Sequence, residues 1–295
     1  MGNKKLNNIK RFVKAVVPPI FIILLDKVKK YFADRGKTEF EYIPEGWSYV
    51  AKPGAMDGWN EKSILEVYKK EWPKYLSMTS STAPLYSNPA APYSSDINTR
   101  VKGHNVIMSF AYSVLTAAGG KKSLSLFDWG GGIGFYSLFA KAILPGVDIQ
   151  YSCRDMDVFV KHANENTPNA LFYSDDSWIK NKYDFVMASA SVQYKTEWKE
   201  LLRDLVSVAS GYVYIAQLPV VPKEKSFVFI QRPYKYGYNT EYLGWCLNKK
   251  EFLSCAKDLG LELVREFTYG YELPILNAPE QNEYSGFLFF KKGTA

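Results

Sequence analysis

Residues 124–135 read LSLFDWGGGIGF, an apolar run that passes through one acidic residue, Asp128, into four glycines. A run of this length is typical of a buried strand, and the apolar spacing after the glycines is helical as far as Pro145. Glycine permits a sharp turn from strand to helix and brings backbone N–H groups close to a ligand. The stretch therefore predicts a strand, a glycine-rich turn and a helix, with a ligand at the turn.

The alternation of strand and helix continues on both sides of this turn. A helix with a glycine stop is expected over 104–118. Two strands, over 261–269 and 285–291, have no full helical pattern between them, and residues 218–247 are expected to form a long loop. This order predicts an α/β fold with a doubly wound sheet, which binds ligands at the carboxyl ends of its strands. The other strands are expected at 148–153, 171–173, 183–188 and 212–217, and the other helices at 135–144, 158–166, 196–209 and 248–259.

Three regions are expected along the chain. Residues 1–37 form a basic amphipathic segment, whose apolar run is shorter than the about 20 residues of a spanning helix. We expect a peripheral membrane anchor or a docking helix here, and not a secretory leader. Residues 38–103 are expected to form an aromatic cap, with a helix over 61–75 that Asn60 caps, and 104–295 to form the main domain.

Composition narrows the class of protein. The chain has 47% hydrophobic and 16% aromatic residues, which is typical of a folded protein. Much of its net charge of +7 lies in residues 1–37, which argues against a nucleic-acid-binding core. The 3 cysteines show no paired spacing and there are 2 histidines, so we expect no metal site. A reducing cytoplasm is the expected location. Any membrane contact is expected to be peripheral, on the inner face of the membrane.

Acidic residues follow three of the expected strands. Asp128 precedes the glycines, where it would repel the pyrophosphate of a dinucleotide but attract the ammonium and sulfonium groups of S-adenosylmethionine. Asp155, directly after the strand 148–153, is expected to accept hydrogen bonds from ribose hydroxyls, which both kinds of cofactor carry. Asp175 is expected to accept a hydrogen bond from the adenine amino group. Capping of a turn explains an aspartate at this position equally well. The expected cofactor-binding residues are Asp128, Gly130, Gly131, Gly132, Gly134, Asp155, Met156, Asp175, Asp176 and Ser189.

The stretches FDWGGGIGFYS, YSDD and YDFVMASASVQY, together with Asp155, resemble class I S-adenosylmethionine-dependent methyltransferases over about 104–292. The stretches EYIPEGWSY, GWN, SASVQY, FVFIQRP and TEYLGWCLN, with His104-Asn105, more narrowly resemble a family of methyltransferases often associated with surface-polysaccharide genes. The resemblance implies a Rossmann-like sheet of seven strands with an antiparallel C-terminal strand, and S-adenosylmethionine as cofactor. It implies less about the acceptor, for which a sugar, a glycan or a related small metabolite is expected.

Candidate residues for the acceptor side follow the fourth and fifth strands or begin a helix. His104 is the expected general base if the acceptor is a hydroxyl, with capping or packing of its helix as the alternative. Tyr194 is a second catalytic candidate that could instead serve only in packing. Gln193 and Arg232 are expected to bind the acceptor, the latter within a loop rich in tyrosine.

Two other functions are compatible with the same pattern. An NAD(P)-dependent oxidoreductase uses a related sheet, although Asp128 and the terminal strand pair disfavour it. A non-catalytic, membrane-associated partner in a glycan biosynthesis complex would keep the fold without the chemistry. The intact glycines and acidic residues argue against that loss of activity.

Overall fold

The computed structural model describes residues 38–49, 58–87, 96–167 and 169–293. The chain divides into two compact units, 1–38 and 39–295, and the description below concerns the second. The expected membrane anchor or docking helix lies outside the described residues, and the proposed boundaries at 37/38 and 103/104 stay predictions.

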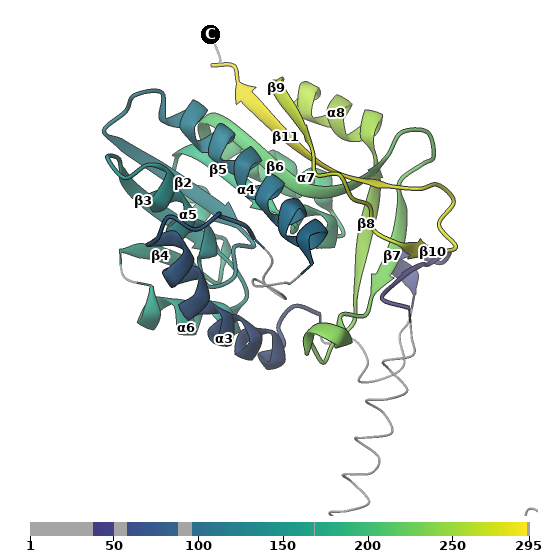
Figure 1. The fold of residues 1–295 in the computed structure, drawn as a ribbon. Helices are drawn as coiled ribbons and strands as arrows, with labels where there is room; N and C mark the ends of the chain where they lie inside the picture. Colours follow the sequence, from purple (N-terminus) through teal and green to yellow (C-terminus); the bar gives the residue numbers. More distant parts are fainter. Residues whose placement is uncertain (1–37, 50–57, 88–95, 168, 294–295) are drawn as a thin grey trace, which may run out of the picture. The chain divides into compact units, whose positions relative to one another are not determined.

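The predicted seven-stranded sheet is present. Its parallel part has the order β6-β5-β2-β3-β4, with β11 antiparallel to β6 and β9 antiparallel to β11 (Figure 1). The chain leaves β2 toward β3 on one side and later returns to β5 on the other, so the carboxyl ends of β2 and β5 lie at a topological switch point. The bounds are β2 Ser123–Trp129, β3 Asp148–Arg154, β4 Ala170–Tyr173, β5 Tyr183–Ser189, β6 Ala209–Val221, β9 Leu261–Thr268 and β11 Glu283–Lys291.

Helices cover both faces of this sheet, as a doubly wound fold requires. One hydrophobic core joins the sheet to α3, α4, α5 and α6, and includes Phe110 and Phe139. The other joins it to α7 and α8, and includes Leu202 and Phe252 (Figure 1). None of the helices in the described ranges is both long and apolar enough to cross a membrane. The bounds are α3 Lys62–Thr79, α4 Ile97–Ala118, α5 Phe135–Ile143, α6 Asp157–Asn166, α7 Trp198–Val208, α8 Lys249–Asp258, and for the short 3-10 helices η1 Gly46–Ser48, η2 Asp176–Lys180, η3 Val192–Tyr194 and η4 Tyr234–Tyr236.

Four further strands extend the sheet, and the prediction of a long loop over 218–247 is wrong. The strands β7 and β8 form an antiparallel pair, and β8 continues the sheet through Val220 and Leu247. This pairing is possible because β6 runs past its last partner in β5 and offers its free edge to β8. The cap region adds β1 beside β7, and β10 pairs with β1; the bounds are β1 Phe40–Tyr42, β7 Phe227–Gln231, β8 Tyr242–Asn248 and β10 Ile275–Leu276.

Two helices in the first hundred residues begin differently from their prediction. The side chain of Glu61, and not that of Asn60, caps α3 by accepting a hydrogen bond from the Ser63 N–H at 3.0 Å. Asp96 caps α4 by accepting from the Thr99 N–H at 2.9 Å, so this helix starts before His104. Polar capping residues outside the apolar pattern therefore set both starts.

Candidate cofactor and acceptor site

The glycine turn connects the end of β2 to the start of α5, as predicted. The Gly130 N–H donates to the Arg154 carbonyl at 2.8 Å, which ties the turn to the end of β3. At Gly131, a Cβ atom would lie 2.3 Å from Asp128 Oδ2 and 2.9 Å from the Tyr151 hydroxyl. No side chain fits there, so the absence of a Cβ lets the turn pack directly on the Asp128 carboxylate.

Asp128 is a buried carboxylate with an incomplete set of hydrogen bonds. It pairs with Cys153 of β3 and Met187 of β5, and only 1% of its surface is exposed. The Tyr151 hydroxyl donates to Oδ2 at 2.6 Å, whereas Oδ1 has no hydrogen-bond partner among the described residues. The pKa of Asp128 is raised to about 7, mainly by burial and in addition by the neighbouring Asp155, against the lowering effect of the Tyr151 hydroxyl. An approaching cation would stabilise the ionised form.

Asp155 is a second buried carboxylate at the glycine turn and an electrostatic neighbour of Asp128. Its Oδ2 accepts a hydrogen bond from the Gly132 N–H at 2.6 Å, and its Oδ1 accepts from the Met156 N–H at 2.7 Å. Burial raises the pKa of Asp155, and these two N–H groups oppose the rise. The structure thus brings together Asp128, the glycines, Asp155 and Met156, as the sequence predicts.

Asp175 and Asp176 lie in the turn that leads from β4 into η2, and both are exposed. Asp175 Oδ1 accepts hydrogen bonds from the Ser177 N–H at 3.0 Å and the Ser177 hydroxyl at 2.6 Å, and these bonds lower the pKa of Asp175. Asp176 has Asp204 of α7 as an electrostatic neighbour. The capping role for Asp175 is therefore present, and contact of either residue with adenine stays a prediction.

Neutral polar side chains gather at the ends of β5 and β6. The Ser189 hydroxyl lies 2.8 Å from the Tyr136 hydroxyl and accepts a hydrogen bond from Gln217 Nε2 at 2.9 Å. Gln193 is fully buried, and its Nε2 donates to the Gln217 carbonyl at 3.3 Å. Its Oε1 has no partner in the part of the chain that the structure describes. The amide of Gln193 can therefore accept one more hydrogen bond at this edge of the sheet.

Gln217 holds this group together and was not predicted. It has a φ of +52°, in the left-handed region that side chains other than glycine rarely adopt, although it lies within β6. Besides its bonds to Ser189 and Gln193, its Oε1 accepts from the Tyr271 hydroxyl at 3.2 Å. Strained residues of this kind cluster at functional sites. The strain follows from tertiary packing and has no local sequence signal.

Tyr194 lies in η3 with its hydroxyl already engaged. The hydroxyl donates to Gln231 Oε1 at 2.7 Å, and the ring packs against Trp59 and Tyr242 at centroid distances of 5.0 and 5.1 Å. Burial raises the pKa of Tyr194, so the hydroxyl stays neutral. The structure therefore places Tyr194 as a neutral hydrogen-bonding and packing residue, and its catalytic role stays a prediction.

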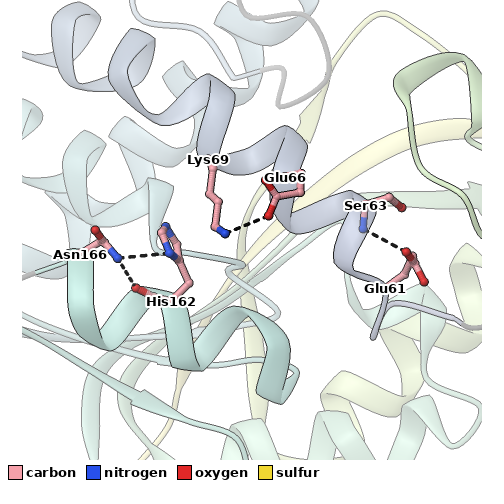
Figure 2. A network of polar contacts seen from close by, with 6 residues as sticks. All are labelled: Glu61, Ser63, Glu66, Lys69, His162 and Asn166. Atoms are coloured by element: carbon pink, nitrogen blue, oxygen red, sulfur yellow. Dashed lines mark hydrogen bonds and ion pairs between the residues drawn. The ribbon is translucent and has the colours of Figure 1, made fainter.

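His104 lies inside α4, well after its start at Ile97, with a defined tautomer. Its Nδ1 is 2.7 Å from the Leu85 carbonyl, and because a carbonyl only accepts, the proton resides on Nδ1. In the neutral ring Nε2 is then free to accept a proton. The other histidine, His162, lies on α6 beside Lys69 of α3 (Figure 2), and burial and the Lys69 charge lower its pKa.

Arg232 follows β7 and is held between carboxylates. Its guanidinium forms ion pairs with Glu41 at 2.7 Å and with Glu241 at 3.5 Å. These contacts neutralise the positive charge that a phosphate would need, so binding of an anionic acceptor by Arg232 stays a prediction without support from its surroundings. Across the described ranges, no group of three or more His, Cys, Asp and Glu side chains could hold a metal ion.

No protein-family model and no curated protein sequence matches the chain. Solved structures of similar fold include the magnesium protoporphyrin IX methyltransferase of Synechocystis with S-adenosylmethionine bound, at 13% identity and a TM-score of 0.47, covering 82% of this chain and 100% of that one. An S-adenosylmethionine-dependent methyltransferase from Clostridium acetobutylicum shares 10% identity at a TM-score of 0.42, covering 63% and 92%. Human N-acetylserotonin methyltransferase shares 14% identity at 0.42, covering 78% and 70%. At this level of similarity, the function has to be inferred from the chain's own residues.

Proposed function

We propose that the chain transfers a methyl group from S-adenosylmethionine to a hydroxyl of a sugar, a glycan or a related small metabolite. The observation that carries the proposal is the packing of two neighbouring carboxylates, Asp128 and Asp155, on one glycine turn. Asp128 is buried with Oδ1 unpaired among the described residues, and Asp155 accepts the Gly132 N–H. Two carboxylates here favour a cationic ligand that carries a ribose and no phosphate.

The residues of the turn fit this cofactor. Asp128 would face the ammonium of the methionine part, and an ion pair would offset the cost of burying its carboxylate. Asp155 would accept hydrogen bonds from the ribose hydroxyls, and Gly131 leaves room for the Asp128 carboxylate against the turn. When bound, S-adenosylmethionine supplies an electrophilic methyl group on a sulfonium sulfur.

The neutral groups at the ends of β5 and β6 suit an uncharged acceptor. Ser189, Gln193 and Gln217 offer hydrogen bonds without charge, and alignment of an acceptor in this way can supply about 7–11 kcal/mol of the barrier. His104, through Nε2, would take the proton of the acceptor hydroxyl as the methyl group passes from sulfur to that oxygen and S-adenosylhomocysteine leaves. The polysaccharide association is proposed from the sequence resemblance. The cytoplasmic location is proposed from the unpaired cysteines, and the membrane contact from the basic amphipathic pattern of residues 1–37. Association with liposomes that survives high salt would support the membrane contact.

Calorimetry with two ligands separates the leading function from the oxidoreductase. We expect the purified protein to bind S-adenosylhomocysteine, which keeps the ammonium and ribose, and not NAD, whose pyrophosphate would face Asp128. Binding of NAD alone would refute the proposal. Binding of neither ligand, with stable capture of a partner protein, would favour the non-catalytic alternative.

The affinity for S-adenosylhomocysteine should depend on the protonation of Asp128. Because the pKa of Asp128 is about 7 in the free protein, the carboxyl is mostly neutral below pH 7 and its attraction for the ligand ammonium is lost. Between pH 7.5 and 5.5 we expect the affinity to fall by up to about tenfold per pH unit below 7. Calorimetry across this range measures it, with Asp128→Asn as the control. If the Asp128→Asn variant kept the wild-type pH dependence of affinity, the dependence would come from another titrating group.

Removal of the His104 imidazole should slow transfer without affecting the cofactor. A general base contributes about 10²–10⁴-fold, so we expect His104→Ala to lower kcat by at least about 100-fold with unchanged affinity for S-adenosylhomocysteine. The acceptor can be found by mass spectrometry of glycans and metabolites from cells with and without the gene. His162→Ala is the matched control. Undiminished turnover in His104→Ala would remove His104 as the base.

A further inference from the structure

Tyr68, in the middle of α3, lies directly over the glycine turn. A Cβ atom at Gly132 would be only 2.8 Å from Cε2 of the Tyr68 ring, so the ring and the turn are in contact. The ring stacks on Phe159 at 5.4 Å with an interplanar angle of 29°, and meets Phe135 edge-on at 5.4 Å and 80°. Phe135 begins α5 and Phe159 lies in the first turn of α6. Tyr68 therefore sits where two helices begin at the ligand edge of the sheet.

The hydroxyl of Tyr68 lies in the surroundings of Asp155. Burial raises the pKa of Tyr68, and the nearby Tyr238 and Asp155 raise it further, so the hydroxyl stays neutral and donates a hydrogen bond to the Tyr238 hydroxyl. The Tyr68 and Tyr238 rings are 6.4 Å apart and nearly perpendicular. Tyr68 thus joins the expected ribose carboxylate on one side to the segment between β7 and β8 on the other.

Aromatic packing holds α3 in place over the glycine turn. Trp72 and Tyr75 follow Tyr68 at helical spacing and pack on Phe135 at 5.4 and 4.5 Å. Beside this stripe α3 runs along α6, where Lys69 pairs with Glu66 at 2.9 Å and lies near His162 (Figure 2). The apolar stripe orients α3, so the Tyr68 ring is presented to the turn by a rigid helix.

We propose that Tyr68 is a cofactor-binding residue that walls the site beside Gly132 of the glycine turn and contacts the ribose or methionine part of bound S-adenosylmethionine. The assignment rests on the function proposed above. The ring provides an apolar wall that keeps water from Asp155, which strengthens the hydrogen bonds of that carboxylate. The hydroxyl, whose proton is donated to Tyr238, can accept a hydrogen bond from a ribose hydroxyl or the ammonium of the ligand.

Calorimetry with S-adenosylhomocysteine as the probe tests this role. We expect Tyr68→Leu, which keeps apolar bulk but removes the ring and hydroxyl, to weaken binding at least about tenfold. Tyr68→Phe should weaken it about threefold, because the ring remains and only the neutral hydrogen bond is lost. Leu76→Ala is the matched control, since Leu76 is 44% exposed on the same helix, and it should bind like wild type. Thermal melts identify any variant that does not fold.

A second measurement keeps the test independent of folding defects. With 3-fluorotyrosine at position 68 alone, we expect the fluorine resonance to shift on addition of S-adenosylhomocysteine and not on addition of NAD. If wild type does not bind S-adenosylhomocysteine, the proposed function fails. If wild type binds, but Tyr68→Leu binds equally well and the fluorine resonance does not move, the role of Tyr68 alone is overturned.

Discussion

Asp155→Asn is expected to lower the affinity for S-adenosylhomocysteine about 100-fold. The carboxylate is expected to accept hydrogen bonds from the ribose, and bonds to a charged group contribute about 1.5–3 kcal/mol each. A loss of about 3 kcal/mol corresponds to about 100-fold in affinity. A neutral amide avoids the cost of burying a charge, but its NH2 group would face either the Gly132 or the Met156 N–H, so a thermal melt has to show that the variant folds. Calorimetry on the folded variant measures the effect.

Asp157→Asn is the matched control for this substitution. Asp157 is the next carboxylate along the chain, but it is exposed and forms an ion pair with Lys161 at 2.7 Å within α6. Exposed pairs of this kind contribute little to stability, and Asp157 has no hydrogen bond to the glycine turn. We expect wild-type affinity. Equal losses in both variants would mean that the general negative potential, and not Asp155, holds the ligand.

Gly131→Ala is expected to damage both the fold and the cofactor site. The new Cβ would lie 2.3 Å from Asp128 Oδ2, so the carboxylate or the turn must move. Overpacking of this kind costs about 1–3 kcal/mol, and each kcal/mol lowers Tm by about 2–4 °C in a unit of this size. Because the displaced carboxylate is the one expected to face the ammonium, affinity for S-adenosylhomocysteine should fall at least about tenfold.

Gly146→Ala provides the comparison, since a Cβ there would meet nothing within 4 Å. Its effect on Tm should be small, and its affinity should equal that of wild type. Thermal melts and calorimetry on the two variants check the prediction. A Gly131→Ala protein with wild-type affinity would show that the turn does not carry the ligand.

The local sequence was sufficient for the main sheet and the centre of the site. Strand and helix periods, with glycine as the turn residue, are properties of neighbouring residues, so β2, the turn and α5 were predictable. Asp155 was predictable because parallel strands end at one edge of the sheet, so the residue after β3 must lie near the turn after β2. The same reasoning placed Ser189 and Gln193 together at the end of β5.

The sequence by itself therefore determined the doubly wound sheet, the glycine turn and the two carboxylates that face it, because each follows from short-range pattern and strand order. Only the tertiary structure decided the β7–β8 extension, the strained Gln217 and the tautomer of His104, since these depend on pairing and contacts between distant segments. It also decided that Tyr68, far from the turn along the chain, packs on Gly132. The apolar stripe of α3 predicts that one face of the helix is buried, but it does not tell which element buries it. The packing of distant segments in the folded chain selects that partner.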